Sequence, residues 1–419
     1  MPSNDKERIR RLMLLFALVY TSEGIGGGLV AQPLNYYLKQ VAGWTPLQIT
    51  SGVALLSIPW LIKPLFGIVS DTVVLFGYRR KSYLALTNIV AAIACFATLL
   101  IAGAGSLLFL LALLGYALAA ASAVAGALLV ENGQRFSVSE RFVNQQWIWY
   151  NVANVASAII AGAILDHFTP ATGLNIVVAA VGVFPLGIAV FGARLFEEPK
   201  SANSVGRLGH SFSAVMSVFK SRMIWLIAIF IFLYDFSPGF GLPLYYHMTD
   251  DLKFSQGFIG ALGSISSAGS IVAGIIYDRF LGKLPSARML YVGIAVGIFA
   301  NLSYLTLHDP ATAIVVNLID GFSFMLLYVS ALTLAADFCP KEAEGFFYAI
   351  MMSIISFADI ASDNAGSYLY EHVFHSTLRP LIFTSAAFTA LSLVLIPLLR
   401  LGRKRQGEAV LAATDSSRT

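Results

Sequence analysis

Apolar stretches of membrane-spanning length alternate with short polar or Gly/Pro-containing breaks along most of the chain. Between Lys81 and Glu131 lie 49 residues without a single Asp, Glu, Lys or Arg. One helix of that length would rise about 73 Å, more than twice the roughly 30 Å of a bilayer core. The run therefore predicts two membrane helices that turn at the glycines of residues 103–106. The same pattern predicts twelve transmembrane helices, at residues 12–38, 46–70, 82–103, 107–131, 142–166, 171–194, 223–248, 255–278, 289–308, 311–336, 345–370 and 380–400.

The composition is that of a protein embedded almost entirely in a membrane. Hydrophobic residues make up 57% of the chain and charged residues 12%, and the mean hydropathy is +0.76. Ordinary soluble domains carry about 25% charged residues. The net charge of +4 is too small and too scattered to indicate nucleic-acid binding. The two cysteines, Cys95 and Cys339, lack the spacing of a metal site and cannot define a disulfide framework.

Basic residues predict the orientation of the chain. An even number of crossings puts both termini on the same side, and both ends are rich in arginine. On this topology 24 of the 27 basic residues fall on one side, which the positive-inside rule identifies as the cytoplasm. We therefore expect an integral protein of the plasma membrane, in bacteria the inner membrane, with both termini cytoplasmic. The first apolar stretch has no small-residue cleavage pattern and is expected to be retained as a helix.

The longest polar break, residues 195–222, divides the chain into two halves of six helices each. The expected parts are a first bundle at residues 1–196, a cytoplasmic linker at 197–222, a second bundle at 223–405 and a cytoplasmic tail at 406–419. One motif recurs in the two halves, as Gly67-x-x-x-Asp71 and, 207 residues later, Gly274-x-x-x-Asp278. Two parallel six-helix repeats are the arrangement of major facilitator transporters. The expected fold is an all-α membrane protein of two pseudo-symmetric six-helix bundles.

Each copy of this motif is followed by basic residues in the next cytoplasmic loop. The glycine permits close helix approach and the aspartate can pair with loop arginines or a helix N-terminus, so the element resembles the cytoplasmic gating motif of that superfamily. Neighbouring charges at helix ends would complete the gate. The expected gate residues are Lys63, Gly67, Asp71, Arg79, Arg80, Glu131, Gly274, Asp278, Arg288 and Asp337. The alternative is that the arginines only set the topology.

Several carboxylic acids lie inside predicted membrane helices, where a charge is costly and indicates a cavity or a partner. Glu23 and Asp235 occupy nearly equivalent positions in the first and seventh helices, and four glycines adjoin Glu23. Carboxyl groups in a cavity can bind and release protons as access alternates, which predicts proton coupling. The expected proton and substrate pathway includes Glu23, Asp235, Asp320, Asp359 and Asp363. Each could instead only hydrogen-bond a neighbouring helix, and the last two could lie in a partly solvated outer half.

Three residues of the fifth predicted helix, Trp147, Asn151 and Asn154, follow i, i+4, i+7 spacing and share one face. This face could offer a stacking surface with amide hydrogen bonds to a solute, although an aromatic residue there is as often packing. The chain has no nucleotide-binding loop, zinc-protease helix or serine nucleophile elbow. We therefore expect no enzyme activity, no cofactor and no metal site, and transport driven by a gradient.

One string in the second predicted helix and the following loop is more specific. It comprises Pro59-Trp60-Leu61-Ile62-Lys63-Pro64, Ser70-Asp71 and Gly77-Tyr78-Arg79-Arg80. Together with the segment Ala335–Pro340 it resembles the signatures of the folate-biopterin transporter family within the major facilitator superfamily. By that resemblance the solute would be a pterin or folate, whose flat ring would stack on aromatic side chains and meet amides or carboxylates.

The expected function is secondary active transport of a small organic solute by alternating access, coupled to protons and performed by a monomer in the lipid bilayer. One alternative is an exporter of another amphipathic metabolite, such as a siderophore or a drug, because nothing in the sequence fixes the direction. Another is a membrane-embedded receptor or enzyme. The two-fold repeat and the confinement of intramembrane charges to a few helices argue against that third possibility.

Overall fold

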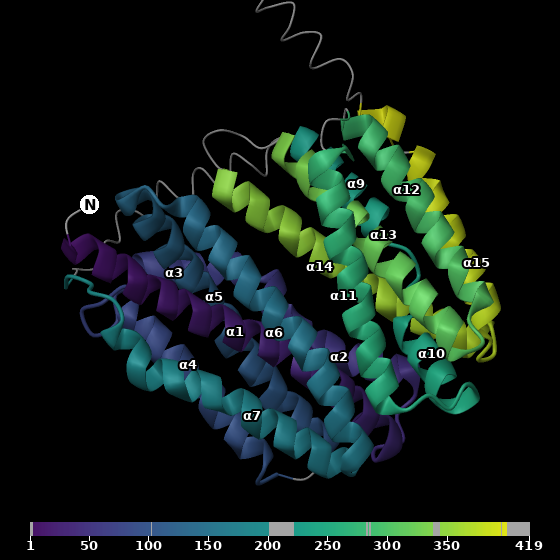
Figure 1. Ribbon diagram of the computed structural model, residues 1–419, viewed down its shortest axis with the longest axis horizontal. Helices are drawn as coiled ribbons and strands as arrows, with labels where there is room; N and C mark the ends of the chain where they lie inside the picture. Colours follow the sequence, from purple (N-terminus) through teal and green to yellow (C-terminus); the bar gives the residue numbers. More distant parts are fainter. Residues whose placement is uncertain are drawn as a thin grey trace, which may run out of the picture. The chain divides into compact units, whose positions relative to one another are not determined.

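The computed structural model describes residues 3–101, 103–200, 222–281, 284, 286–337, 344–394 and 396–399. In these residues the regular structure is helical, apart from an isolated bridge between Leu75 and Tyr78 (Figure 1). Most of the predicted linker and the whole predicted tail lie outside the described residues. The expected all-α class is therefore confirmed.

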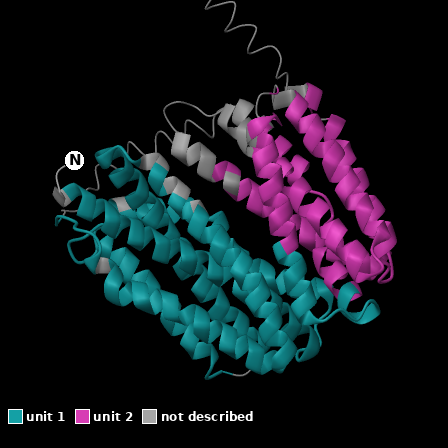
Figure 2. Ribbon diagram, viewed as in Figure 1, with its two compact units in different colours: residues 1–214, 248–264 teal, residues 215–247, 265–419 magenta. Residues whose placement is uncertain are grey.

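The chain forms two compact units (Figure 2). Unit 1 comprises residues 1–214 and 248–264, and unit 2 comprises residues 215–247 and 265–419. The stretch 248–264, which the predicted boundaries put in the second bundle, thus packs with unit 1. Polar contacts hold it there: Lys39 pairs with Asp250 at 2.6 Å, and the Gln32 amide donates to the carbonyl of Gln256 at 2.8 Å.

In the described residues, seven helices and a 3-10 turn lie wholly within unit 1. Each long helix coincides with an apolar stretch of the sequence, because a helix satisfies its own backbone hydrogen bonds in lipid. The elements are α1 Ser3–Gln40, α2 Pro46–Leu61, α3 Lys63–Thr72, α4 Lys81–Thr98, α5 Ala104–Phe136, α6 Ser139–His167, α7 Pro170–Phe191 and η1 Gly192–Arg194.

Unit 2 has shorter and more interrupted helices than unit 1. One helix, α11, begins in unit 1 and continues in unit 2, and the turn η2 is likewise shared. The elements are α9 Arg222–Asp235, α10 Gly241–Tyr246, η2 His247–Asp251, α11 Gln256–Arg279, α12 Ser286–Ser303, η4 Tyr304–Thr306, α13 Pro310–Asp337, α14 Glu344–Tyr368, η5 Leu369–Val373, α15 Leu378–Leu391, η6 Ser392–Val394 and η7 Ile396–Leu399.

Nine helices within the described residues are long and apolar enough to cross a membrane. They are Asp5–Gln40, Pro46–Ser70, Lys81–Thr98, Ala104–Phe136, Ile148–His167, Pro170–Phe191, Gln256–Tyr277, Arg288–Thr306 and Pro310–Ala331. The three other predicted stretches are also helical, but 223–248 is interrupted between α9 and α10, 345–370 corresponds to α14, and 380–400 contains a shorter apolar helix. Twelve crossings therefore stay a prediction.

Proline and glycine explain where the predicted stretches are interrupted. Pro64 lies at the start of α3, where the stretch 46–70 divides into α2 and α3, because proline lacks the N–H that would continue the hydrogen bonding. Pro238 lies in the non-helical segment between α9 and α10. Gly103 has a φ of +107°, so α5 begins at Ala104 and the predicted turn lies just before the second helix rather than through residue 106.

The core of unit 1 is centred on the packing of α1 against α6. The Phe16 and Phe142 rings meet edge to face with centroids 5.1 Å apart, and both are fully buried. Glycines bring the backbones close further along α1. A methyl group at Gly24 would lie 2.6 Å from the carbonyl oxygen of Tyr150, and one at Gly28 would collide with Asn154. Close glycine contacts of this kind are typical of membrane helix pairs.

The core of unit 2 joins α9, α12 and α14 through fully buried aliphatic side chains, among them Ile231, Leu290 and Met351. On unit 1, by contrast, Ile93 of α4 and Val183 of α7 are about three-fifths exposed, at 60% and 59%. Large exposed apolar side chains on long helices are expected where the surrounding medium is lipid. The outer faces of these helices therefore suit a bilayer.

Two helices, α2 and α13, begin at capping residues that lie just before their apolar spans. Thr45 and Gln48 form a reciprocal capping box at the start of α2. At the start of α13, Asp309 Oδ1 accepts the backbone N–H of Thr312 at 2.7 Å. This hydrogen bond lowers the pKa of the exposed Asp309 carboxyl.

Candidate functional site

A charged and aromatic cluster lies in unit 1 and consists of Glu23, Lys63 and Trp60. Lys63 Nζ is 3.8 Å from Glu23 Oε1 and 5.0 Å from the centroid of the Trp60 ring. The Glu23 side chain is 13% exposed and that of Lys63 is 35% exposed. Glu23 Oε2 is buried and has no hydrogen-bond partner in the part of the chain that the structure describes. One carboxylate oxygen therefore faces a cation, and the other can take a proton or a solute donor.

The local backbone explains how this cluster forms. The break before Pro64 places Lys63 at the first turn of α3, and the side chain turns toward α1. Two tyrosines, Tyr20 on α1 and Tyr150 on α6, lie close enough to Glu23 to interact with its carboxylate electrostatically. The sequence analysis assigned Lys63 to the cytoplasmic gate. In the structure its acidic neighbour is the predicted pathway residue Glu23.

The predicted face of α6 lies beside α1. The side chains of Asn151 and Asn154 are exposed, and Asn154 Oδ1 faces Gly28 of α1. The side chain of Trp147 lies outside the described residues. Unit 1 thus offers a carboxylate, a lysine, an indole ring and exposed amides on neighbouring helices, which are groups that can bind a polar heteroaromatic solute.

In unit 2, the interruption between α9 and α10 is held against α14 by one backbone hydrogen bond and one side-chain hydrogen bond. The carbonyl of Ser362 accepts the N–H of Gly239 at 2.9 Å, and the Ser362 hydroxyl donates to the carbonyl of Ser237. A methyl group at Gly366 would collide with the carbonyl of Gly239, so the two backbones approach closely here. Irregular backbone at membrane depth is stable only where it is buried in protein or lines a cavity.

This packing brings together three of the predicted carboxylates. Asp235 is the last residue of α9, and its carboxyl group interacts electrostatically with Asp359 of α14, as Asp359 does with Asp363. Asp363 Oδ1 faces Gly239, where a methyl group would lie 2.7 Å away. Asp235 Oδ2 is buried and has no hydrogen-bond partner among the described groups.

The fourth predicted carboxylate of unit 2, Asp320 on α13, has a different partner. It forms a hydrogen bond with the hydroxyl of Tyr304, a side chain that is 6% exposed. A buried carboxylate with a tyrosine partner is better satisfied than one without, since an unpaired polar group in an apolar region is costly. Asp320 thus has a hydrogen-bond partner of its own, whereas Asp235, Asp359 and Asp363 interact with one another.

The predicted gate of unit 1 forms a connected network around Arg80, which is 3% exposed. Its guanidinium donates to Ser70 Oγ at 2.6 Å and to Glu131 Oε1 at 2.8 Å. Arg79 lies 3.9 Å from the same Glu131 oxygen. Two arginines and a glutamate that were predicted from distant parts of the chain thus meet at the ends of α3, α4 and α5.

Glu198, which the sequence analysis did not select, caps α4 from the segment that follows α7. Its carboxylate accepts the backbone N–H groups of Arg79, Arg80 and Lys81 at 2.8 to 3.1 Å. A carboxylate in this position satisfies donors that lack a helical partner and interacts favourably with the helix dipole. Only its place in the longest polar break could have pointed to it, since three backbone donors leave no trace in a sequence.

The other predicted gate positions are less informative in the structure. A methyl group at Gly67 would meet no described atom within 4 Å, so a close helix contact is absent there, and one at Gly274 would lie 3.6 Å from Met325. Arg288 is exposed near the start of α12. The side chains of Asp71, Asp278 and Asp337 lie outside the described residues.

Sequence reasoning also missed residues that hold the site together. Ser362, Tyr304 and Ser70 are ordinary polar residues in apolar stretches, and only the packing of α14, α13 and α3 shows what they bind. Among the side chains that the structure describes, no group of three or more His, Cys, Asp or Glu is placed to hold a metal ion.

Comparison with known proteins gives a consistent picture. The sequence model of the BT1 family matches residues 23–406. The chain is 27% identical over 373 residues to the folate-biopterin transporter of Synechocystis sp., covering 85% of this chain and 74% of that protein. It is 25% identical to probable folate-biopterin transporter 6 of Arabidopsis thaliana, covering 88% and 78%, and 24% identical to folate transporter 2 of Plasmodium falciparum, covering 91% and 86%.

Solved structures show the fold. The nucleoside transporter NupG matches with a TM-score of 0.69 at 16% identity, covering 95% of this chain and 99% of that one. A bacterial homologue of the human lysosomal transporter Spinster matches with a TM-score of 0.65 at 13% identity, covering 97% and 98%. At these identities the likeness concerns the arrangement of helices and not the solute.

Proposed function

The chain belongs to the BT1 family, and from this membership we propose that it carries a pterin-like or folate-like solute across the membrane by alternating access, coupled to protons. That the chain is an integral membrane transporter with a major-facilitator type of fold, and not an enzyme, follows from the family and its relatives. The family resemblance drawn from the motifs around Lys63 is thereby confirmed.

The observation that carries the proposed solute is the cluster of Glu23, Lys63 and Trp60. A pterin ring carries amide and amino N–H donors on one edge, which suit a carboxylate such as Glu23, and a flat face that suits the Trp60 ring. Folate adds an anionic glutamate tail, for which Lys63 offers a cation at this cluster. The names of the relatives, which include folate and folate-biopterin transporters, support this solute class.

The carboxylates support the proposal of proton coupling. Glu23 and Asp235 each have a buried oxygen without a hydrogen-bond partner in the described part of the chain. Such an oxygen is costly when charged and less costly when it holds a proton, so its protonation would follow the exposure of the site to either side of the membrane. Monomeric action, cytoplasmic termini and location in the plasma or bacterial inner membrane belong to the same proposal.

A second candidate function is export of a cationic amphipathic compound. The observation that favours it is the group formed by Asp235, Asp359 and Asp363 in unit 2, because three carboxylates attract a positive charge more readily than the anionic tail of folate. A pterin without the tail is neutral and is compatible with both sets of groups.

Uptake into liposomes that contain the purified protein tests the two candidates. We expect labelled folate and pterin to accumulate when a proton gradient is imposed, and the accumulation to collapse when a protonophore is added. Lys63→Gln should weaken folate binding by about tenfold or more, the loss expected for one charged hydrogen bond, while pterin is affected less.

The control is Lys253→Gln, which removes the same charge from an exposed turn and should leave uptake unchanged. Transport of an organic cation with no movement of folate or pterin would favour the second candidate. Because Lys63 also pairs with Glu23, the comparison is made on binding and not on uptake: equal loss of folate and pterin binding in Lys63→Gln would contradict the proposed role of Lys63 in binding the tail.

A further inference from the structure

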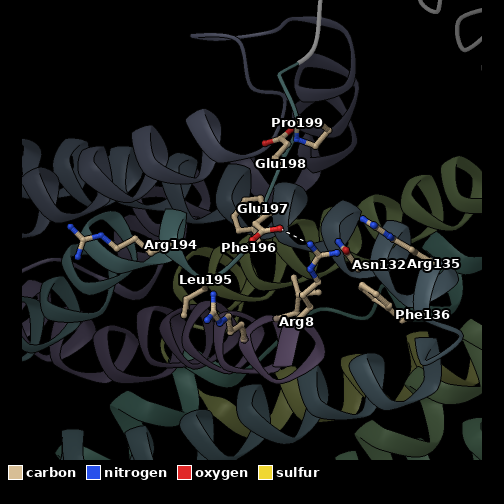
Figure 3. Close-up of a pocket in the computed structure, with 12 residues that line it drawn as sticks. Arg8, Asn132, Arg135, Phe136, Arg194, Leu195, Phe196, Glu197, Glu198 and Pro199 are labelled. Carbon is tan, nitrogen blue, oxygen red and sulfur yellow. Dashed lines mark hydrogen bonds and ion pairs between the residues drawn. The ribbon is translucent and has the colours of Figure 1, made fainter. Parts of the chain in front are cut away.

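A pocket of about 420 Å³ lies in unit 1, and its lining includes none of Glu23, Lys63 and Trp60 (Figure 3). It is formed by the start of α1, the end of α5 and the segment that follows α7. Its volume lies in the range of pockets that hold small ligands. Its apolar base includes Leu12, Phe136 and Phe196, and its charged lining consists of Arg8, Arg11, Arg135, Arg194, Glu197 and Glu198.

The charges of this pocket do not balance, because its lining has four arginines and two glutamates, and both glutamates are already engaged. Of the arginines, Arg11 also pairs with Glu7 at 3.0 Å. Glu198 accepts three backbone N–H groups at the start of α4. Glu197 pairs with Arg8 at 2.8 Å, but its side chain is 74% exposed, and an exposed ion pair of this kind is weak. The pocket therefore keeps an excess of positive charge next to apolar side chains.

Two of the arginines are arranged for an additional anion. The guanidinium carbon of Arg135 lies 5.3 Å from the centroid of the Phe136 ring, within the range of a cation–π contact. No ion pair of Arg135 is found among the described residues. In Figure 3, Arg8, Asn132 and Arg135 gather on one side of the pocket, and Glu197 approaches Arg8 from above. The exposed Glu197 carboxylate occupies the position that a stronger anion would take.

We propose that this pocket binds a phosphate group between Arg8 and Arg135, in exchange for the carboxylate of Glu197. A guanidinium is planar and has several N–H donors, so it can form more hydrogen bonds with the oxygens of a phosphate than with one exposed carboxylate. The phosphate comes either from the headgroup of an acidic phospholipid or from a free phosphate compound. None of the lining residues belongs to the proposed solute pathway, so the inference does not depend on the identity of the transported compound.

The first arm of the test uses inorganic phosphate and purified protein in a neutral detergent, with chloride at equal ionic strength as the reference. A ligand that binds the folded state raises the melting temperature, so titration yields the apparent affinity. We expect Arg135→Gln to weaken phosphate binding roughly tenfold, as for the loss of one charged hydrogen bond. Arg10→Gln, a control on α1 whose side chain is 83% exposed and outside the pocket, should bind like the wild type.

Glu197→Gln should change the phosphate affinity in the opposite direction from Arg135→Gln. Because the proposed phosphate displaces this carboxylate from Arg8, removing the competing charge should tighten phosphate binding several-fold. A purely structural role of the Arg8 and Glu197 pair would instead lower the melting temperature without any gain in affinity. Arg135→Gln and Glu197→Gln both change exposed side chains, so we expect both variants to fold and the phosphate affinity to be measurable in each.

The second arm compares the protein in vesicles of phosphatidylcholine with vesicles that also contain phosphatidylglycerol. Stabilisation by phosphatidylglycerol that Arg135→Gln removes identifies the lipid headgroup as the source. Stabilisation by inorganic phosphate without a lipid effect identifies a free phosphate compound. The proposal is overturned if neither anion stabilises the wild type, if Arg135→Gln binds phosphate as the wild type does, or if Glu197→Gln weakens the binding.

Discussion

At the scale of single residues, Glu23 stands out because its two carboxylate oxygens are in different surroundings. Oε1 faces the Lys63 ammonium at 3.8 Å, whereas Oε2 is buried without a hydrogen-bond partner in the described part of the chain. A charge in this setting depends on Lys63, and any solute anion that draws Lys63 away leaves the carboxylate uncompensated. Proton uptake by Glu23 and solute binding by Lys63 would thereby be linked through one ion pair.

Substitution of Glu23 by glutamine tests this link. Gln is nearly the same size but cannot take up a proton, so we expect Glu23→Gln to abolish uphill accumulation while downhill exchange of solute stays measurable. Uptake with and without an imposed proton gradient, in liposomes of matched protein content, gives both quantities.

The matched control is Glu7→Gln. Glu7 is a partly exposed glutamate on the same helix, α1, and it pairs with Arg11. This substitution should leave both uptake modes intact. Proton-driven accumulation by Glu23→Gln at the wild-type level would remove Glu23 from the coupling mechanism.

The candidate site residues could be predicted from the cost of a charge in hydrocarbon, but the partners of these residues could not. Glu23, Lys63 and Asp235 attract notice in the sequence because few reasons exist to keep a charge in a membrane helix. The pairing of Glu23 with Lys63 joins residues of α1 and α3, and depends on the bend before Pro64. A periodic pattern contains no information on which faces of two distant helices meet.

At the scale of elements, the start of α4 is held by a carboxylate from outside the helix. Glu198 accepts the N–H groups of Arg79, Arg80 and Lys81, so the chain leaving unit 1 is fastened to the same turn that carries the predicted gate arginines. The side chain of Arg80 points from there to Ser70 and Glu131. A single turn thus combines backbone capping with side-chain pairing.

Removal of this cap should loosen the first turn of α4. Loss of a capping side chain costs about 1 kcal/mol in typical helices, so Glu198→Ala should speed amide hydrogen exchange at residues 79–81 several-fold. Exchange measured by mass spectrometry on peptides that cover this turn provides the check. The neighbouring Glu197→Ala, which removes no backbone acceptor of α4, should leave these amides unchanged. Equal exchange in both variants would show that the cap contributes nothing.

Apolar length predicted which segments are helical, since each of the twelve stretches contains a helix in the described residues. It did not predict the interruptions of the second and seventh stretches. Pro64 and Pro238 lie in stretches that are apolar overall on both sides of the proline, so the hydropathy pattern continues through them. Whether a proline bends a membrane helix or ends it depends on which neighbouring groups satisfy the freed backbone, here Ser362 for the segment before α10.

At the scale of the whole molecule, the distribution of basic residues makes a prediction about topology. Arg10 near the start of α1 should be cytoplasmic, and Thr306 at the end of η4 should be outside. In a background with Cys95 and Cys339 replaced by alanine, Thr306→Cys should react with a membrane-impermeant maleimide in intact cells. Arg10→Cys should react only after the cells are permeabilised.

The reverse labelling pattern would invert the orientation. Labelling of both positions in intact cells would place them on the same side and contradict the predicted crossings between them. Blocking with a permeant maleimide beforehand serves as the control, because it should abolish both signals.

The two-unit division was expected from the repeat, but the stretch 248–264 was not expected to pack with unit 1. The sequence places its residues after the seventh predicted helix, whereas Lys39 and Gln32 of α1 bind Asp250 and Gln256 directly. A hydropathy pattern predicts a helix as a whole and cannot show that its two ends pack with different units. Polar contacts at its end decide the unit with which that end packs.

The close contact of α1 with α6 sets limits on the sequence variation that this protein can tolerate. A side chain at Gly24 or Gly28 would overlap atoms of Tyr150 or Asn154, whereas one at Gly27 would meet no described atom within 4 Å. Three nearby glycines thus differ in their freedom to change. Inherited substitutions in α1 should therefore accumulate at position 27 and be purged at positions 24 and 28, giving a four-residue rhythm of constraint along a helix whose composition looks uniform.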